Sequence, residues 1–389
     1  MKDHITLVEP APWEEEELLT NGDAFFSSLE QGIGNAQISI ELEMYIFEND
    51  VIGERIVQAL IAAHKRGVSV RVVVDGVGSK GWVYSLGRSL DKAKISRKVF
   101  HQLPWERLLS KEPTFDSEPT WASLYERLNS RDHRKVCIVD GSTAWVGSLN
   151  ISSAHSKSLY GDLAWRDLAI RVQGDAVRHL VSAFNLIWYP RRPKYRRERR
   201  LARYLVKQSE ATSVRLNATR YLRHRNYQRM LLRFDSAKER IWITNAYFVP
   251  SGSLLTALTN AASRGVDVKI LTPSVSDVFF MPWVAAAFHT ALLGAGVQVF
   301  EFLPSILHAK SMIIDNCAIV GTSNLNDRSL IHDLEVDILT NSSSTVTSLI
   351  SEYTQDLTHS RRLTLETCQR YTWFHKLLGH SALLFRHWI

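Results

Sequence analysis

The sequence predicts two tandem α/β domains, each with a mixed, largely parallel sheet flanked by helices, packed with pseudo-twofold symmetry around one site. A short pattern, His-x-Lys-x4-Asp, occurs twice in the chain, and each copy runs on to a Gly and an Asn. The same succession of apolar runs precedes both copies. The two copies of the pattern are His133, Lys135 and Asp140, and His308, Lys310 and Asp315.

In the first half, an extended run over 38–47 precedes a helix that ends in Arg-Gly-Val at 66–68. A run rich in valine follows over 69–76, and the apolar residues 136–139 come directly after the first His-x-Lys. Runs of β-branched residues separated by a helix are typical of strand–helix–strand units. Glycine suits the position just after a helix, so we expect the helix to end there.

The second half repeats this plan. Its extended run covers 240–249, Arg-Gly-Val stands at 264–266, and further strands are expected over 267–274 and 311–314. We therefore predict domains at 1–188 and 213–360, a basic linker at 189–212 and an amphipathic tail at 361–389.

The first half is longer between its helix and its motif, and the excess falls within 80–130. This segment is rich in aromatic residues, which either pack on the domain or form a groove or lid for acyl chains. The basic linker is either a solvated face or a surface for anionic lipid. The tail, with Trp373, Phe374 and Trp388 among cations, is expected to lie in a membrane interface, with packing on the domain as the alternative.

Composition describes a globular protein, with 45% hydrophobic and 22% charged residues. The net charge of +7 favours polyanionic partners, either anionic lipid or nucleic acid. Three cysteines lack metal-ligand spacing and are expected to be reduced thiols. The N-terminus does not resemble a signal peptide, and no apolar run reaches the ~20 residues of a membrane span, so we expect only peripheral membrane contact.

His-x-Lys on a strand places both side chains on one face. Two such pairs suit a phosphodiester: one imidazole attacks phosphorus, two ammonium groups hold the oxygens, and the other imidazole transfers protons. A single His of this kind is more often a core histidine, but the duplication favours a catalytic site.

These motifs resemble the phospholipase D superfamily. The stretches IELEMYIFENDVIGERIVQALIAAHKRGVSVRVVVDGVGS and LLGAGVQVFEFLPSILHAKSMIIDNCAIVGTSNLNDRSL are similar to bacterial cardiolipin synthases, most of all to the B type. The resemblance covers about residues 18–360. It implies that two phosphatidylglycerol molecules become cardiolipin and glycerol through a phosphatidyl-histidine, with no metal or other cofactor.

The resemblance implies that His133 is the nucleophile and His308 the general acid and base, although sequence symmetry alone leaves their order open. Asp167 and Glu335 follow the motifs at matching distances and are our candidates to orient His133 and His308, respectively. Asp140 and Asp315 belong to the catalytic motif, but we expect both to be structural. The phosphate-binding set is Asn150, Asn324, Ser148 and Thr322, the two hydroxyl groups supporting the loop, with the same role considered for Arg328 and Ser329.

Two departures from the family pattern stand in the second half. The turn after Asp315 is one residue shorter than the turn after Asp140, and Asp333 replaces a usual Asn. The expected partner is an anionic phospholipid membrane, at the cytoplasmic face of a bacterial inner membrane, and no nucleic acid. The alternatives are a phospholipase D or another phosphatidyltransferase, a nuclease, or an inactive membrane-binding relative.

Overall fold

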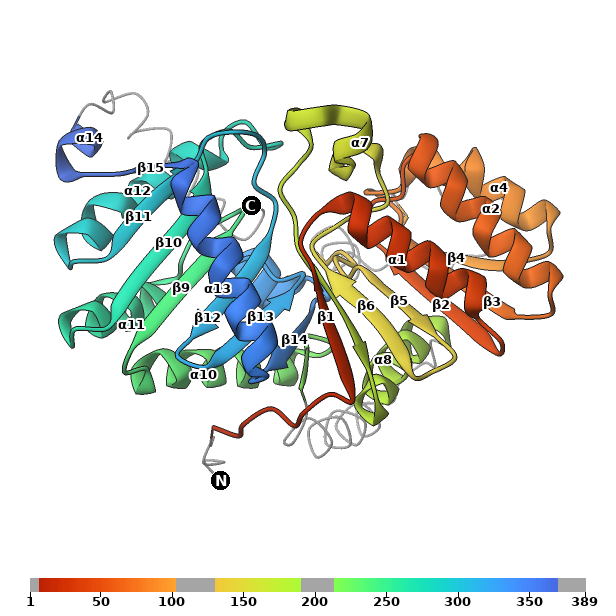
Figure 1. The fold of residues 1–389 in the computed structure, drawn as a ribbon, viewed down its shortest axis with the longest axis horizontal. Helices are drawn as coiled ribbons and strands as arrows, with labels where there is room; N and C mark the ends of the chain where they lie inside the picture. The colour runs from red at the N-terminus through yellow and green to blue at the C-terminus, as the bar shows by residue number, and fades with distance from the viewer. Residues whose placement is uncertain (1–6, 103–129, 190–212, 370–389) are drawn as a thin grey trace, which may run out of the picture.

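The computed structural model describes residues 7–102, 130–189 and 213–369, and Figure 1 shows them as two α/β halves side by side. The first half contains a seven-stranded sheet in the order β1-β7-β6-β5-β2-β3-β4. Its strands are β1 (Glu15–Leu19), β2 (Ser39–Met44), β3 (Ser69–Asp75), β4 (Ser96–Phe100), β5 (Val136–Val139), β6 (Thr143–Gly147) and β7 (Ala169–Gln173).

The second half contains an eight-stranded sheet in the order β15-β11-β10-β9-β12-β13-β14-β8. Its strands are β8 (Val214–Leu216), β9 (Arg240–Asn245), β10 (Asp267–Pro273), β11 (Gln298–Phe302), β12 (Lys310–Ile314), β13 (Cys317–Gly321), β14 (Val336–Thr340) and β15 (Ser360–Arg362). Apart from the added β15, this is the strand order of the first sheet, so the predicted duplication is confirmed at the level of topology.

Both sheets are mixed, as predicted, but they are not largely parallel. Only β2-β3-β4 and β9-β10-β11 pair in parallel, and the other neighbours are antiparallel. Two of the antiparallel pairs follow from the short connections after the His-Lys strands. A two- or three-residue turn between β5 and β6, or between β12 and β13, can join only antiparallel neighbours.

Helices flank the sheets. The longer ones are α1 (Gly22–Asn35), α2 (Val51–Lys65), α4 (Leu86–Lys92), α8 (Arg178–Trp188), α10 (Arg220–Ser236), α11 (Gly252–Ser263), α12 (Met281–Gly294) and α13 (Ser343–Thr358). Shorter pieces are α3 (Lys80–Val83), α7 (Lys157–Tyr160), α14 (Leu365–Gln369), 3-10 turns at Ser153–His155, Gly161–Leu163 and Asp175–Val177, and a π-helical turn at Arg328–His332.

The two Arg-Gly-Val segments end helices as predicted. Gly67 follows α2 with φ +97° and Gly265 follows α11 with φ +91°. A side chain is strained at such angles, so glycine is the natural residue there. At the other ends, Asp50 accepts a hydrogen bond from Gly53 N at 2.9 Å and Ser251 accepts one from Leu254 N, which caps both helices.

Three large apolar cores lie in the described part of the chain. One lies on the outer face of the first sheet against α1 and α2, and one on the outer face of the second sheet against α10 and α11. The third lies between the sheets and takes residues from both halves, including Val146, Phe184, Val320 and Tyr353. Because this inner core is shared, the two halves form one continuous body and their sheet ends meet at one site.

The linker 190–212 and most of the tail, 370–389, lie outside the described residues, as do 103–129 within the aromatic segment, so the predictions made for them stay predictions. The domain boundaries stay predictions for the same reason. Within the described part of the aromatic segment, Trp82 is fully buried and stacks on Phe47 with ring centroids 4.6 Å apart, which is a packing role. No helix in the described ranges is long and apolar enough to cross a membrane.

Candidate active site

His133 and His308 stand just before β5 and β12, where the two halves meet, and both are buried. Short bridges between the halves fix their backbones. His133 N donates to Leu334 O at 3.1 Å, and His308 N donates to Arg166 O at 2.8 Å. Each histidine is therefore tied to a loop of the opposite half, and these two loops carry the candidate orienting carboxylates.

The carboxylates pair across the halves, which corrects the predicted pairing. Glu335 accepts from Nδ1 of His133 at 3.0 Å, and Asp167 accepts from Nδ1 of His308 at 3.0 Å. The prediction that each carboxylate serves the histidine of its own half is therefore wrong. Spacing along one repeat cannot reveal that the loop after each motif crosses to the other sheet.

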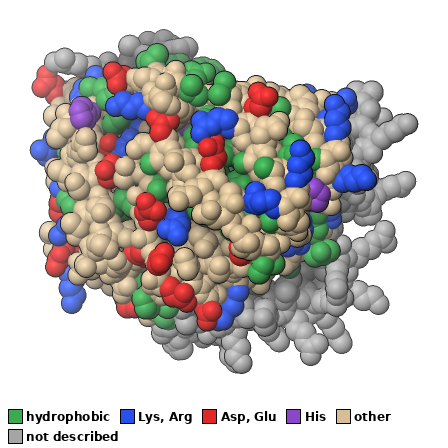
Figure 2. All heavy atoms as spheres, turned by 45° about the vertical axis from the view of Figure 1, so that its right-hand side comes forward, with side chains coloured by type: hydrophobic (Ala, Val, Ile, Leu, Met, Phe, Trp, Pro, Cys, Tyr) green, Lys and Arg blue, Asp and Glu red, His purple; other side chains and the backbone are tan. Residues whose placement is uncertain are grey.

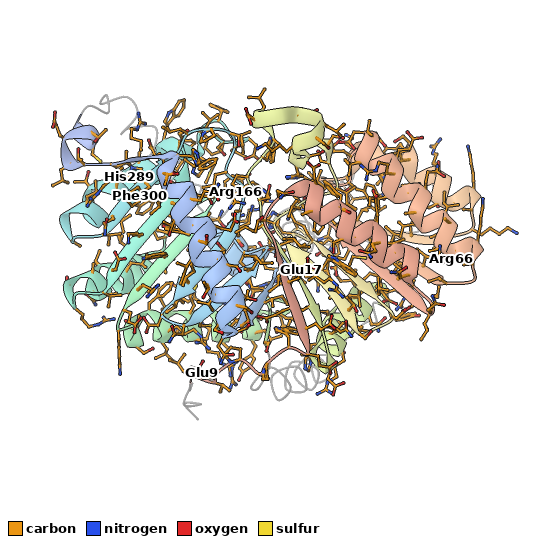
Figure 3. All side chains as sticks on the ribbon, viewed as in Figure 1. Glu9, Glu17, Arg66, Arg166, His289 and Phe300 are labelled. Carbon is orange, nitrogen blue, oxygen red and sulfur yellow. The ribbon has the colours of Figure 1, made fainter. Side chains whose placement is uncertain are left out.

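The crossing loop of the first half is anchored by Arg166, which Figure 3 labels at the centre of the molecule. Its guanidinium donates to Asp356 at 2.8 Å and to Glu352 at 2.8 Å, both on α13 of the second half. These charge-assisted bonds hold the residue next to Asp167 against the other domain.

Both lysines of the motifs turn back on their own histidines. Lys135 Nζ donates to His133 O at 2.8 Å, and Lys310 Nζ donates to His308 O. Both are almost fully buried. Burial lowers the pKa of Lys135 to about 8 and that of Lys310 to about 7. Two ammonium groups sharing a buried site are poised to gain an anionic ligand, because a phosphodiester would compensate their desolvation.

The histidines are held neutral near pH 7 in this arrangement. Burial, reinforced by Lys135 and Lys310, lowers the pKa of His133 well below its usual value. Burial and Lys310 lower the pKa of His308 to about 4, against the opposing effect of Asp167. With Nδ1 donating to a carboxylate, each ring keeps a lone pair on Nε2, the nitrogen needed for attack or proton transfer.

Three aromatic rings form walls around the histidines, and we did not predict them. The Tyr45 ring lies 4.8 Å from the His133 ring, while Trp165 and Tyr247 lie 5.5 and 6.4 Å from that of His308. Tyr247 also donates to Asp277 at 2.6 Å. A signal did exist for the tyrosines, since Tyr45 is the first residue after β2 and Tyr247 the second residue after the equivalent strand β9.

The two asparagines lie in the site, but they are bound differently. Asn150 Oδ1 accepts a hydrogen bond from Ile46 N at 3.3 Å, whereas Asn324 Oδ1 is buried with no partner in the described part of the chain. A buried amide of this kind normally has a partner. Asn324 Oδ1 therefore has an unused acceptor position, and its phosphate-binding role stays a prediction.

Ser148 and Thr322 have a different role from direct phosphate binding. Ser148 Oγ donates to Leu168 O at 3.0 Å and accepts from Leu168 N at 3.1 Å. Thr322 Oγ1 donates to Glu335 and accepts from Val336 N at 3.0 Å. Both hydroxyl groups are used within the protein, so they hold the carboxylate-bearing segments in place and do not face a ligand.

Asp140 and Asp315 lie at the far ends of β5 and β12, where their carboxylates accept hydrogen bonds from backbone groups. Asp140 accepts from the N–H groups of 37, 38 and 39, and Asp315 accepts from those of 238, 239 and 240. Both have left-handed backbones, with φ +53° and +50°. The expectation that they are structural is supported by these contacts.

Asp333 lies on the bridge between the halves. Its Oδ1 accepts from Arg131 N at 2.8 Å, and its Oδ2 lies 3.3 Å from Arg328 Nε. Arg131 in turn pairs with Asp75 at 3.0 Å. Burial raises the pKa of Asp333 to about 6, although Arg328 opposes this. Asp333, which stands where the family usually has Asn, is therefore part of a buried ionic network beside the site.

Ser329 was considered from the sequence as support for the phosphate-binding loop. Its hydroxyl accepts a hydrogen bond from Asn324 N at 2.9 Å and donates one to Glu335 at 2.5 Å. In the first half the equivalent place is taken by His155, which sequence reasoning missed. Within the described residues, no group of three or more His, Cys, Asp or Glu side chains is arranged to hold a metal ion.

Known proteins share this arrangement of sequence and fold. The family model described as "Cardiolipin synthase, PLD-like domain" matches residues 29–188 and 230–358. A cardiolipin synthase of Halalkalibacterium halodurans is 32% identical over 381 residues, covering 94% of this chain and 71% of that protein. A cardiolipin synthase of Alkalihalophilus pseudofirmus is also 32% identical, over 95% of this chain and 71% of its own length.

Among solved structures, the phosphatidylserine synthase of Haemophilus influenzae Rd KW20 superposes with a TM-score of 0.69. The alignment covers 98% of this chain and 96% of that one at 14% identity. A polyphosphate kinase of Porphyromonas gingivalis superposes with a TM-score of 0.56 at 11% identity, over 88% of this chain and 50% of that one. At such low identity these two structures establish a shared fold and nothing more.

Proposed function

The chain belongs to the cardiolipin synthases with phospholipase D-like domains, and from this premise we propose that it converts two phosphatidylglycerol molecules into cardiolipin and glycerol. One observation carries the proposal. His133 and His308, one from each half, share a buried site with Lys135 and Lys310, and each is oriented by a carboxylate of the opposite half. Such a site suits the exchange of one phosphodiester for another.

In the first proposed step, Nε2 of His133 attacks the phosphorus of a phosphatidylglycerol. The bond from phosphorus to the glycerol oxygen breaks, and His308 gives that oxygen a proton, so glycerol leaves. Lys135 and Lys310 stabilise the oxygens that gain negative charge in the transition state. A bound phosphodiester places negative charge beside His308, which favours the protonated ring that this step needs.

In the second proposed step, His308 removes the proton from the terminal hydroxyl group of another phosphatidylglycerol. The resulting oxygen attacks the phosphorus, the bond to Nε2 of His133 breaks, and cardiolipin is released. The two steps return both histidines to their starting protonation states, and they use no nucleotide or metal.

The first experiment incubates the purified chain with phosphatidylglycerol vesicles and a chelator, and then resolves the lipids. We expect cardiolipin and released glycerol from the native chain and neither product from His133→Ala or His308→Ala. His224→Ala, an exposed histidine outside the site, serves as the matched control and should be active. Phosphatidic acid without cardiolipin would identify water as the acceptor, and cleavage of DNA without lipid turnover would replace the proposal with a nuclease.

We also propose that the chain binds an anionic phospholipid membrane peripherally, at the cytoplasmic face. Apolar side chains are exposed on the segments that lead to the site walls. Leu163 is 74% exposed two residues before Trp165, and Phe279 is 73% exposed two residues after Asp277, the partner of Tyr247. Both segments flank His308, so acyl chains of a substrate would meet them on entering.

The described surface supports this choice of region. Figure 2 shows acidic and basic side chains interspersed over the visible face, and hydrophobic side chains at its upper edge, the edge at which Figure 1 shows α7. Leu159 and Tyr160 of α7 are exposed next to Leu163. Apolar groups at this edge provide contact with a bilayer that the mixed charges elsewhere do not.

Vesicle sedimentation tests the membrane proposal. We expect Leu163→Ser and Phe279→Ser to reduce binding to phosphatidylglycerol vesicles several-fold and together to abolish it, because each removes a large apolar side chain from the interface. Ile38→Ser is the matched control, since Ile38 is 70% exposed just before β2, at the end opposite the site. Equal binding by all variants would place the membrane contact elsewhere on the chain.

A further inference from the structure

One residue breaks the symmetry of the two halves inside the site. In the second half, the residue five places after Asn324 is Ser329, whose hydroxyl oxygen accepts from Asn324 N at 2.9 Å. In the first half, the residue five places after Asn150 is His155, whose Nε2 accepts from Asn150 N at 3.3 Å. The backbone contact is the same, but the side chain is an imidazole in one half and a hydroxyl in the other.

The hydrogen bonds of His155 determine its tautomer. Because Nε2 accepts from a backbone N–H, the ring proton is on Nδ1, and Nδ1 donates to Asp167 Oδ2 at 2.7 Å. The other oxygen of Asp167 accepts from Nδ1 of His308 at 3.0 Å. One buried carboxylate therefore joins two imidazoles, and His155 is itself almost fully buried.

In the second half, the equivalent carboxylate, Glu335, receives its hydrogen bonds from other groups. Glu335 accepts from His133, from Ser329 at 2.5 Å and from Thr322, so its additional donors are hydroxyl groups. Glutamate is longer by one methylene and reaches a short serine, whereas aspartate is shorter and is met by a long histidine. The two pairs are matched in length and differ in the chemistry of the donor.

This difference separates the two carboxylates electrostatically. Burial would raise the pKa of Asp167, but His308 and His155 outweigh burial and hold that pKa well below its usual value. Burial raises the pKa of Glu335 well above its usual value, although Lys135, Ser329 and Thr322 oppose the rise. The pKa of Asp167 therefore lies below that of Glu335.

We infer that His155 is a positioning residue that keeps Asp167 ionised against His308, and thereby fits His308 for proton transfer while leaving His133 as the nucleophile. This inference rests on the proposed phosphodiester exchange. An ionised carboxylate stabilises an imidazolium, which a general acid must form in each turnover. A nucleophilic histidine instead needs a free lone pair on Nε2.

Other charged and titratable groups act on this cluster, so the experiment must separate His155 from them. Besides His155 and His308, the described groups that act on Asp167 or His308 are His133, Lys135, Lys310, Arg166, Tyr247 and Asp277. None of them is changed in the variants below.

The test uses two variants that copy the opposite half, assayed from pH 5 to pH 9. His155→Ser removes the imidazole, and His155→Ser with Asp167→Glu rebuilds the serine–glutamate pair of the second half. For the single variant we expect kcat to fall roughly 10- to 100-fold, by analogy with the loss of a hydrogen-bond partner that orients a metal-binding histidine. KM should change less than about threefold, since no substrate contact is lost.

The pH profile distinguishes positioning from simple structural support. Without His155 the pKa of Asp167 rises, so on the acidic side kcat should begin to fall at a higher pH than in the native chain. The double variant should regain thermal stability, but its kcat should still fall at a higher pH on the acidic side than that of the native chain. The inference is overturned if the double variant shows the same acidic pH dependence of kcat as the native chain. It is also overturned if the single variant does so, because an imidazole at 155 is then not required.

Two readouts keep this result separate from the proposed function. Hydrolysis of bis(4-nitrophenyl) phosphate reports the phosphodiester chemistry when phosphatidylglycerol is not the substrate. Nitrogen-15 NMR of histidine-labelled protein reports the tautomer of His155 without any turnover, and a protonated Nε2 there would contradict the inference. If the chain made no cardiolipin but the variants still changed the pH dependence of kcat on the soluble diester, only the proposed function would be contradicted.

Discussion

Glu335 and His133 are 202 residues apart in the chain, yet the Glu335 carboxylate accepts a hydrogen bond from His133 Nδ1 at 3.0 Å. The reciprocal bond joins Asp167 to His308. Each half thus supplies a histidine to the site and a carboxylate to the other half's histidine. Neither half contains a complete set, which explains why the shared apolar core between the sheets matters for activity as well as for stability.

The crossed pairing predicts the effect of Glu335→Gln. A glutamine can still accept a hydrogen bond from Nδ1, but it carries no charge to favour the correct tautomer of His133. We expect kcat to fall by about 10² to 10⁴ with little change in folding, by analogy with neutralised carboxylates in catalytic triads. Rapid-quench measurement of the phosphohistidine on His133 checks this. Normal formation of the intermediate would show that Glu335 does not serve His133.

Much of this arrangement follows from the sequence, because the repeated motif sets residue types and strand positions. His133, Lys135, His308 and Lys310 lie together because His-x-Lys precedes a buried strand in both halves. The short connections after β5 and β12 also predict hairpins, a signal that our expectation of largely parallel sheets overlooked.

What could not be predicted depends on contacts between the halves. The exchange of Asp167 and Glu335 arises where the segments near Asp132 and Leu334, and near Arg166 and Leu307, form bridges across the interface. No periodicity or spacing within one repeat encodes such a bridge. His155 was missed for a related reason, since it stands where the other half has a serine and only the fold reveals the equivalence.

Lys310 predicts how substrate binding depends on pH. Its pKa is lowered by burial to about 7, so the ammonium is charged below this value and loses its charge as the pH rises through it. We expect KM for the phosphodiester to rise between pH 7 and pH 9. In Lys310→Arg the charge persists across this range. The KM of that variant, measured by initial rates, should be nearly independent of pH even if kcat is lower.

A pH-dependent KM in Lys310→Arg that matches the native curve would assign the effect to another group. Lys135, whose pKa is lowered by burial to about 8, is the nearest alternative, and Lys135→Arg is the corresponding control. The two variants together separate the contributions of the two halves to phosphate binding.

Asp333 predicts a pH-dependent cost in stability. Its pKa is raised by burial to about 6, so between pH 4 and pH 6 the folded state binds a proton that the unfolded state has lost. Stability from this group is therefore present below about pH 4 and is lost as the pH rises to 6. The loss is about 2–3 kcal/mol at ~1.4 kcal/mol per pKa unit.

Asp333→Asn should therefore be more stable than the native chain at pH 7, by up to about 2 kcal/mol after the ion pair with Arg328 is lost, and similar to it at pH 4. Urea denaturation at both pH values measures the difference. An equal difference at pH 4 and pH 7 would show that Asp333 does not titrate in this range, and that its network with Arg131 keeps it ionised throughout.

The backbone contacts of Asp140 and Asp315, the last residues of the two motifs, predict that replacing Asp140 lowers stability and leaves kcat almost unchanged. Burial would raise the pKa of Asp140, but the backbone N–H groups of 37, 38 and 39 outweigh it and lower the pKa, so the carboxylate is bound as an anion. Asp140→Ala leaves these donors without their acceptor and places alanine at φ +53°. We expect a loss of about 1–3 kcal/mol in the free energy of unfolding.

Asp140→Asn is the matched control for this change. Asparagine tolerates a left-handed backbone and retains one acceptor oxygen, so its loss should be about half that of alanine or less. Urea unfolding measures stability, and kcat per folded molecule measures chemistry at a temperature where each variant is folded. Because Asp140 lies at the end of β5 opposite His133, kcat should stay within about twofold of the native value, since surface caps contribute to folding rather than to the reacting groups. A fall in kcat of the size expected for Glu335→Gln would instead place Asp140 in the catalytic machinery, where its motif position first suggested it.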